Sequence, residues 1–187
     1  MLVYLWNENT IIREQEKPLV MTHKIHKTSD CTEVWECLQT QHKSLHASIV
    51  FRPGDIIIRF SAKEILTQPN YLSLQIDRDR HIVLEPDFLQ FTNHSCEPNI
   101  YFDPKAMEII ALNPIQKQEE LTFFYPSTEW IMNRGFACLC GSSQCLKKIQ
   151  GAAQINPNIL YKYRLSEHIK ELLASWFYRF ENKFLLW

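Results

Sequence analysis

A run of closely spaced cysteines constrains this chain more than any other feature of its sequence. Cys138, Cys140 and Cys145 follow the pattern C-x-C-x4-C, and Gly141 between them frees the backbone. Three thiols at this spacing can converge on one ion, and tetrahedral zinc takes four ligands, preferably thiolates. The alternative is that the three are reduced thiols that pack as small apolar side chains. The density of thiols favours zinc, and the candidates for the fourth ligand are Cys31, Cys37, Cys96 or a histidine.

The composition is that of one globular domain, or of a domain with a small appendage. The chain has 187 residues, of which 45% are hydrophobic and 22% are charged. Its net charge is −1, so no basic field favours direct binding to nucleic acid. No apolar run approaches the roughly 20 residues of a membrane helix, and the amino-terminal stretch lacks the basic start of a signal peptide. We therefore predict an intracellular, cytoplasmic protein with reduced thiols and no membrane partner, small enough to diffuse into a nucleus.

Short strands and turns dominate the secondary structure that the sequence predicts for the middle of the chain. The spacing of Val34, Cys37 and Leu38 indicates a helix over residues 31–41. A second helix is expected after Ser166, which can cap it. Its apolar stripe consists of Leu165, Ile169, Leu172, Leu173 and Trp176. Strands are expected at residues 2–6, 48–51, 56–60, 71–76, 81–86, 109–112 and 120–125, with turns at 52–55 and 77–80. This order of elements predicts an α+β fold with a β-rich centre.

Two further segments carry candidate functional groups. Residues 93–99, NHSCEPN, form a polar loop that is either a rigid connection or part of a site. A thiol nucleophile built from His94 and Cys96 is disfavoured because no acid is evident to orient the histidine. Residues 121–125, LTFFY, end in Tyr125. Such a tyrosine usually belongs to the core, but its phenol can also position or polarise a reacting group.

Taken together, in this order and spacing, the three clusters closely resemble the carboxyl-terminal half of a SET domain and the post-SET cysteine segment that follows it. Residues 93–99 look like the motif N-H-S-C-x-P-N, and residues 119–125 look like G-E-E-L-T-F-D-Y. Residues 138–145 look like the post-SET pattern C-x-C-x4-C. The resemblance runs over about residues 42–151, and the chain is similar to small, stand-alone SET proteins of microbes.

The resemblance implies an α+β SET fold of several small sheets. In the family, the N-H-S-C segment and the tyrosine-bearing segment cross as a pseudoknot, which would bring Cys96 beside the post-SET loop as the fourth zinc ligand. A carboxyl-terminal helix would follow. The expected organisation is a flanking segment at 1–41, a SET core at 42–126, a post-SET zinc segment at 127–151 and a helical extension at 152–187.

The resemblance also implies an activity, two cofactors and a set of site residues. The family consists of S-adenosylmethionine-dependent methyltransferases, most of which act on protein lysines, and the catalytic residue here would be Tyr125. The residues that bind S-adenosylmethionine would be Lys43, Ser44, Leu45, Asn93, His94 and Tyr125. The zinc ligands would be Cys96, Cys138, Cys140 and Cys145. The substrate channel would be lined by Tyr71, Phe102, Phe123, Phe124 and Trp130.

Physical chemistry supports this division of roles. Methyl transfer needs an uncharged amine held in line with the methyl group, whereas a lysine with a pKa of about 10.4 is mostly protonated at neutral pH. A narrow apolar channel beside a sulfonium charge favours the neutral amine, and aromatic walls suit its alkyl stem. In the family, a phenylalanine two residues before the catalytic tyrosine tends to permit higher methylation states. Phe123 therefore implies di- or trimethylation of a lysine substrate.

The chain departs from the family pattern at several positions. Residues 42–44, His-Lys-Ser, stand where the family has Gly-x-Gly, so the backbone there has to keep a negative φ. Lys43 offers a cation to the carboxylate of the cofactor. Gln118 replaces a turn glycine, His46 replaces an aromatic residue, and Phe124 replaces an aspartate.

Three functions remain open on this basis. The leading one is methylation of a lysine in a protein or peptide, with the peptide added as a strand beside residues 71–85. The second is a SET-fold enzyme that tailors a small molecule. The third is a binding module that has lost the cofactor together with the two glycines. The apolar tail from residue 177 to residue 187 either docks on its own domain or forms a dimer surface.

Overall fold

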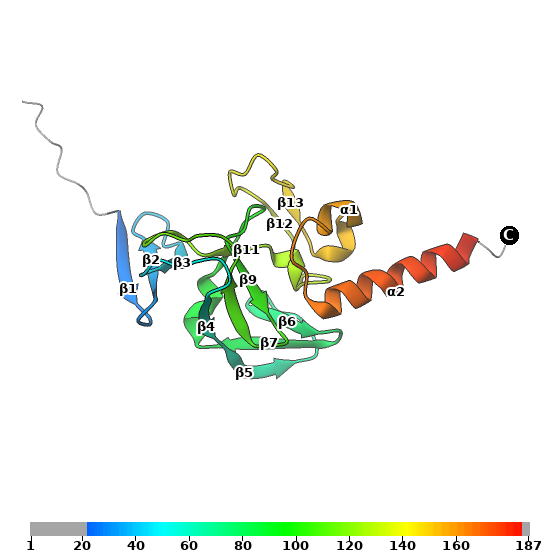
Figure 1. Ribbon diagram of the computed structural model, residues 1–187, viewed down its shortest axis with the longest axis horizontal. Helices are drawn as coiled ribbons and strands as arrows, with labels where there is room; N and C mark the ends of the chain where they lie inside the picture. The colour runs from blue at the N-terminus through cyan, green and yellow to red at the C-terminus, as the bar shows by residue number, and fades with distance from the viewer. Residues whose placement is uncertain (1–21, 185–187) are drawn as a thin grey trace, which may run out of the picture.

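The computed structural model describes residues 22–184 as a β-rich body from which one long helix extends (Figure 1). The strands of this part of the chain form five small sheets, three with three strands and two with two. The predicted β-rich fold of several small sheets is therefore confirmed. The strand expected at residues 2–6 lies outside the described residues. Among residues 22–184, no helix is both long and apolar enough to cross a membrane.

An antiparallel meander opens the described chain. Its strands are β1 (His23–Lys27), β2 (Thr32–Cys37) and β3 (Lys43–Ala47). The helix predicted over residues 31–41 is wrong, since β2 occupies most of that range. Val34 is buried opposite Leu45 of β3, and β2 pairs with a neighbour on each side. Pairing on both edges outweighs a weak helical spacing, and Leu38, which that spacing would bury, is exposed.

Two more antiparallel sheets form the centre of the body. In spatial order their strands are β4 (Ile56–Arg59), β10 (Glu108–Ala111) and β9 (Ile100–Asp103), and β5 (Ser61–Leu66), β7 (Arg80–Glu85) and β6 (Ser73–Asp77). The hairpin predicted around residues 77–80 is present as β6 and β7. The strand predicted at 48–51 is wrong, because only one bridge forms there, between Phe51 and Ile115.

A parallel pair of very short strands joins two segments that are distant in the sequence. These strands are β8 (Asn93–His94) and β11 (Thr122–Phe123). Asn99 strengthens the contact, because its backbone N–H donates to Thr122 O (3.1 Å) and its side-chain Oδ1 accepts from Thr122 N (2.9 Å). The strand predicted at 120–125 is thus shorter than expected, since the chain turns at Pro126 into the 3₁₀ helix η2 (Tyr125–Ser127). Residues 93–99 and 119–125 therefore lie side by side.

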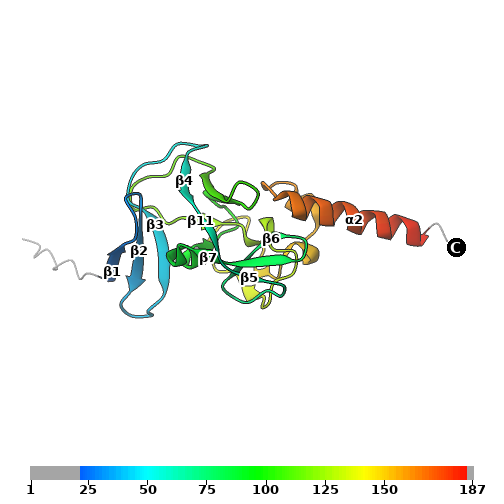
Figure 2. The same cartoon turned by 90° about the horizontal axis from the view of Figure 1, so that it is seen from below.

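The carboxyl-terminal third is largely loop and helix. Its remaining elements are β12 (Phe136–Ala137), β13 (Lys148–Ile149), η3 (Ala152–Gln154), α1 (Pro157–Leu160) and α2 (Glu167–Phe184), and a further 3₁₀ helix, η1 (Asp87–Phe91), precedes β8. Helix α2 begins directly after Ser166, as predicted, and runs away from the body in both views (Figures 1 and 2). Leu165, Ile169 and Leu173 are buried, but Trp176 is 39% exposed, so the buried stripe ends before it. The dimer surface was expected at residues 177–187. Of the side chains in this range, only that of Tyr178 belongs to the described part of the chain.

Three buried clusters hold these elements together. The largest lies among the sheets and includes Leu45, Phe102 and Phe123. A second lies under α2, where Phe124 packs with apolar side chains of α1 and α2. The third consists of Cys96, Cys138 and Ile149 with neighbouring apolar groups. Tyr125 packs against both the first and the third cluster, and Leu146 packs against both the second and the third.

Gly151 provides a test of how tightly the last two clusters are joined. Its φ is +116°, and a β-carbon there would lie 2.6 Å from Trp130 O and 3.0 Å from Ile131 Cα. Because both contacts are backbone atoms, Gly151→Ala should destabilise the fold by about 3 kcal/mol in denaturant titrations. Gly54→Ala is the matched control, since Gly54 has φ +90° but a β-carbon there would meet no atom within 4 Å. It should cost only about 1 kcal/mol, and equal losses for the two variants would contradict this prediction.

Candidate active site and cysteine cluster

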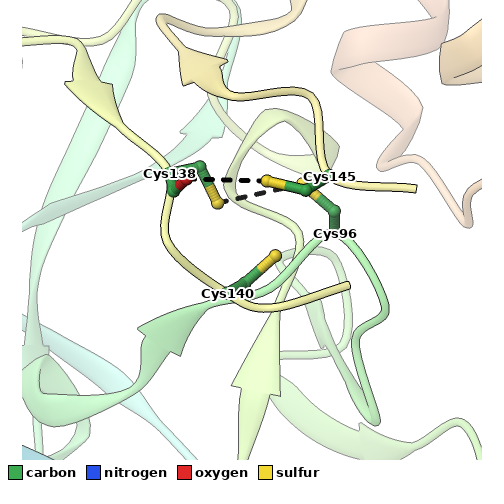
Figure 3. Close-up of side chains that lie close together, drawn as sticks. All are labelled: Cys96, Cys138, Cys140 and Cys145. Atoms are coloured by element: carbon green, nitrogen blue, oxygen red, sulfur yellow. Dashed lines mark hydrogen bonds between the residues drawn. The ribbon is translucent and has the colours of Figure 1, made fainter. Parts of the chain in front are cut away.

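Four cysteine side chains converge between two loops. Cys96 follows β8, and the other three, Cys138, Cys140 and Cys145, lie in the loop that connects β12 to β13. Their sulfur atoms all lie within 4.8 Å of one another, and Figure 3 shows the side chains turned toward a common centre. Of the cysteines that the spacing left as candidates for the fourth position, Cys96 lies in this group, whereas Cys31 and Cys37 lie outside it.

Local backbone geometry closes the cysteine loop. Gly141 and Lys147 both have positive φ, +77° and +64°, which reverses the chain on either side of Cys145. Cys138 N donates to Lys147 O at 2.8 Å, and Cys145 N donates to Ser142 O at 3.1 Å. The loop is therefore held closed by its own main chain, while pairing of β8 with β11 delivers Cys96 from elsewhere in the sequence.

Hydrogen-bond donors point at the sulfur atoms of the cluster. Leu146 N donates to Cys96 Sγ and Lys147 N donates to Cys145 Sγ, both at 3.4 Å. Burial raises the pKa of Cys96, whereas for Cys140 hydrogen bonds outweigh burial and lower the pKa. N–H donors stabilise thiolates, and four thiolates around zinc at about 2.3 Å lie about 3.8 Å apart. The donor set and its spacing therefore fit a tetrahedral metal ion.

His94 links the cysteine cluster to Tyr125. Tyr125 N donates to His94 Nδ1 at 3.3 Å, so the ring proton is on Nε2, which donates to Cys96 Sγ at 3.4 Å. Burial lowers the pKa of His94 to about 4, which keeps the ring neutral at pH 7. The rings of His94 and Tyr125 meet edge to face, with centroids 5.2 Å apart. The two sites therefore share one histidine.

The hydroxyl of Tyr125 is fixed by the main chain. It donates a hydrogen bond to Thr92 O at 2.9 Å. Burial raises the pKa of this phenol, and the negative charges of Glu120 and Glu129 raise it further by smaller amounts. The hydroxyl is therefore protonated at neutral pH. An oriented, protonated hydroxyl beside a carbonyl can position a reacting group without exchanging a proton.

The strand that carries residues 43–45 lies against β8. Asn93 Nδ2 donates to Lys43 O at 3.3 Å and to Glu120 Oε1 at 2.8 Å. Lys43 Nζ lies 5.1 Å from the centroid of the Phe91 ring. A cation, a side-chain amide and strand main chain thus come together, which suits a polar ligand that carries a carboxylate. Leu45 is fully buried in the core and its carbonyl accepts from Leu121 N at 2.7 Å, which leaves at most its N–H for a ligand.

Residues 42–44 need no glycine to adopt this path. The positive φ of this region falls on Gln41, at +57°, and residues 42–44 keep negative φ as expected. Ser44 Oγ donates to His46 Nε2 at 2.8 Å, and His46 Nδ1 donates to Gln118 O at 2.9 Å. Gln118 itself has φ +70°, the left-handed conformation that a glycine would take at a turn. These hydrogen bonds hold the two substituted segments in place.

An apolar cavity of about 660 Å³ opens beside Tyr125. Phe102 and Phe123 line it, and the Phe123 ring centroid lies 4.5 Å from Phe102 and 4.6 Å from Tyr125. Tyr71, which also lines the cavity, is 83% exposed. The structure thus brings four of the predicted channel and catalytic residues to one cavity.

Phe124 and Trp130, which the sequence analysis grouped with the channel, do not line this cavity. Phe124 stacks on Tyr163 with ring centroids 3.7 Å apart, inside the cluster under α2, and Trp130 packs against the same cluster. Successive residues of a strand point to opposite faces, so Phe123 and Phe124 cannot share one wall. Phe124, which stands where the family motif has an aspartate, thus contributes to the cluster under α2.

Glu129 is a cavity residue that the sequence analysis missed. It lines the cavity, and its side chain is buried. Burial raises its pKa to about 7. The sequence did contain a signal for this residue, because Glu129 is the only charged residue in the stretch from residue 121 to residue 133.

Comparisons with known proteins agree with this geometry. A model of the SET domain family matches residues 5–126, which include β8 and β11 but not the cysteine loop. The methyltransferase flvH of Aspergillus flavus is 42% identical over 139 residues, which are 73% of this chain and 78% of that protein.

Histone-lysine methyltransferases match over shorter stretches. The H3 lysine-36-specific enzyme of Debaryomyces hansenii is 28% identical over 119 residues, 59% of this chain, and the H3 lysine-4-specific enzyme of Emericella nidulans is 43% identical over 63 residues, 30% of this chain. The matched regions are 16% and 5% of those two proteins. SET methyltransferases use S-adenosylmethionine. The family model covers more than half of the chain, and the two motifs pair beside a tyrosine-lined cavity, so this chain belongs to the SET domain family and is a methyltransferase.

Proposed function

We propose that this chain transfers a methyl group from S-adenosylmethionine to a lysine side chain in a protein or peptide. The observation that carries the proposal is the position of the Tyr125 hydroxyl, which is held by Thr92 O in the wall of an apolar cavity. Bound S-adenosylmethionine supplies an electrophilic methyl group on a positively charged sulfur. The histone-lysine methyltransferases among the relatives support a lysine substrate.

The residues of this chain would divide the work as follows. Phe102 and Phe123 would enclose the alkyl stem of the lysine and favour its neutral amine by excluding water. Tyr125 Oη and Thr92 O, 2.9 Å apart, would position the methyl group through weak C–H···O contacts. Tyr125 would thus be the catalytic residue, acting by orientation rather than as a base.

The cofactor would be held between β3 and β8. Lys43, Ser44 and Leu45 would line it from β3, with the Lys43 ammonium facing its carboxylate, and Asn93 and His94 would line it from β8. Calorimetric titration of S-adenosylmethionine into metal-replete protein tests this assignment. Binding with a micromolar dissociation constant would support it. No binding at millimolar cofactor to folded protein would overturn the methyltransferase proposal and favour a binding module that has lost the cofactor.

The four-cysteine cluster would hold a structural zinc ion through Cys96, Cys138, Cys140 and Cys145. All four positions are filled by protein thiols, which is typical of structural rather than catalytic zinc sites. His94 Nε2 would donate to one of the zinc-bound sulfurs, as neighbouring donors do around metal ligands. The ion would therefore fix His94 and, through it, Tyr125.

A methylated small molecule is the second candidate product class. A cavity of about 660 Å³ lies within the roughly 300–1,000 Å³ that small-molecule sites occupy. On β6, an edge strand, the N–H of Gln75 is already taken by Glu129 at 2.7 Å, which limits strand addition of a peptide beside residues 71–85. Parallel assays with lysine peptides and with free alkylamines separate the two classes.

Phe123 should set the number of methyl groups added. Its ring packs on Tyr125 and lines the cavity, so wild-type protein should yield di- or trimethyl-lysine in assays with H3 peptides containing lysine 4 or lysine 36. Phe123→Tyr adds a hydroxyl that narrows the cavity and should shift the product to monomethyl-lysine by at least about tenfold, a difference of about 1.4 kcal/mol. Mass spectrometry of the peptides measures the ratio. A strictly monomethyl product from wild-type protein would contradict the prediction.

A further inference from the structure

One carboxyl group lies in the wall of an otherwise largely apolar cavity. Glu129 follows η2 and is 6% exposed, and it lines the cavity together with Tyr125 and Phe123. It lies between the family motifs at residues 119–125 and 138–145, and none of the roles proposed above uses it. Its position in the substrate cavity, rather than at the surface, calls for a chemical explanation.

The carboxyl group is held in a fixed orientation. Glu129 Oε1 accepts a hydrogen bond from Gln75 N at 2.7 Å and one from Thr128 Oγ1 at 3.3 Å. The side chain of Gln75 returns the contact, because its Oε1 accepts from Trp130 N at 2.8 Å. Both donors reach Oε1, and neither reaches Oε2. The group is therefore anchored through one oxygen between β6 and the turn that follows η2.

No cation within the described part of the chain compensates this acid. None of the ion pairs within residues 22–184 involves Glu129. The titratable groups on neighbouring elements are Tyr125 on η2, His81 on β7 opposite Gln75, His168 on α2, which donates to Thr128 O at 2.8 Å, and Arg134, an exposed residue of the cavity wall. Burial lowers the pKa of both histidines, so neither is a standing cation beside Glu129 at pH 7 and above. A buried carboxylate without a counter-ion is costly, and burial raises the pKa of Glu129 to about 7. Such a group persists at functional sites when a ligand supplies the missing charge.

We propose that Glu129 is the specificity-determining group of the cavity and binds the incoming substrate through an ammonium group carried on an apolar alkyl stem. Methyl transfer follows only after this ammonium has lost its proton to solvent, which leaves the neutral amine that reacts. The carboxylate supplies the charge, and the aromatic and aliphatic wall around it encloses the stem. This inference shares one element with the proposed function, namely that the substrate is an amine, and rests on the proposed function to that extent. A lysine side chain and a free alkylamine both meet the requirement, whereas a neutral alcohol of the same shape does not.

If Glu129 only held the fold together through its hydrogen bonds, its charge would not be needed, and Glu129→Gln would bind an ammonium ion as well as the wild-type protein does. The hydrogen bond from Gln75 N needs only a carbonyl-type oxygen, which a glutamine at position 129 also provides. Glu129→Gln therefore keeps the anchor and removes the charge. The pKa of Glu129 is raised in the folded protein, so its neutral form is the one that favours folding. This contribution is fully present below pH 4.5 and is lost as the pH rises through about 7 and Glu129 ionises. Glu129→Gln should thus raise the melting temperature by about 5 °C at pH 8 and leave it unchanged near pH 4.5.

Binding of n-butylammonium, the end of a lysine side chain, tests the proposal without cofactor or turnover. Titration of the full chain by NMR between pH 5.5 and 8.5 should show affinity that rises about tenfold per pH unit up to about pH 7 and then levels off. The sign follows because Glu129 becomes charged as the pH rises, while the probe stays an ammonium ion. At pH 8, Glu129→Gln should bind the probe at least about tenfold more weakly and without pH dependence.

The controls separate charge recognition from a general loss of the cavity. Affinity for n-butanol should be the same in wild-type protein and in Glu129→Gln, and Glu64→Gln, an exposed acid of β5 that lies outside this cavity, should bind the ammonium as wild-type protein does. Equal ammonium affinity in wild-type protein and Glu129→Gln at pH 8 would overturn the proposal, as would no binding at millimolar probe. Failure of S-adenosylmethionine to bind would instead overturn the proposed function and leave the ammonium result standing.

Discussion

Cys96→Ser should abolish stoichiometric zinc binding and lower the melting temperature by more than about 10 °C. Cys96 is 2% exposed and belongs to a buried cluster with Cys138 and Ile149, against which Tyr125 and Phe136 pack. Serine is a poor zinc ligand, so the ion and the loop at residues 136–149 would be lost together. Because the loop also forms part of the cavity wall, methyl transfer should fall with it. Elemental analysis and differential scanning calorimetry measure the two effects.

Cys37→Ser is the matched control for this change. Cys37 is also a free cysteine, half-buried, and donates a hydrogen bond to Gln39 Oε1 rather than facing the cluster. Its substitution should leave about one zinc ion per chain and change the free energy of unfolding by less than about 1 kcal/mol. Retention of zinc by Cys96→Ser would contradict the assignment, and so would wild-type protein that is folded and zinc-free after purification without chelators.

The four-cysteine cluster also shows how far the sequence alone could predict the site. Spacing identifies Cys138, Cys140 and Cys145, because ligands within one loop converge through local geometry. The fourth ligand could not be derived in that way, since Cys96 reaches the cluster through pairing of β8 with β11. That pairing is a contact between segments about thirty residues apart, which no local pattern encodes. The resemblance to a family supplied it, and the convergence of the four sulfurs agrees.

The errors in the sequence analysis have a common physical origin. The helix predicted over residues 31–41 rested on three apolar residues at helical spacing, and pairing of β2 with two neighbouring strands prevailed. Phe124 was grouped with Phe123 because both are aromatic, but alternation along the strand sends the two side chains to different clusters. In both cases, the side of an element that is buried depends on neighbours that are distant in the sequence.

The substituted glycines show the opposite case, in which a sequence-based expectation holds. Residues 42–44 keep negative φ, so their side chains are compatible with the backbone. The left-handed backbone conformation is adopted instead by Gln41 and Gln118, which have φ of +57° and +70°. A non-glycine residue pays an energetic penalty in that region, and the hydrogen bond from His46 Nδ1 to Gln118 O helps to offset it. The missing glycines therefore do not by themselves remove the strand that would contact the cofactor.

Tyr125→Phe should lower kcat by about 100-fold or more while changing the dissociation constant of S-adenosylmethionine by less than about threefold. The hydroxyl is the only group removed, and it lies in the cavity wall, where it donates a hydrogen bond to Thr92 O. An oriented group that acts on the reacting methyl contributes to the transition state rather than to binding of the cofactor. Single-turnover rates with the methylated acceptor identified by mass spectrometry, together with calorimetric cofactor titrations, separate the two quantities.

Tyr163→Phe distinguishes this catalytic role from the loss of a buried hydrogen bond. Tyr163 also donates its hydroxyl proton to a backbone carbonyl, Cys96 O, at 2.9 Å, but it stacks on Phe124 and does not line the cavity. Both variants should lose about 1 kcal/mol of stability, because each gives up one such bond. Only Tyr125→Phe should lose activity far beyond that change. If the two variants lose activity equally, the Tyr125 hydroxyl serves to hold the fold, and catalysis must rest on other groups of the cavity.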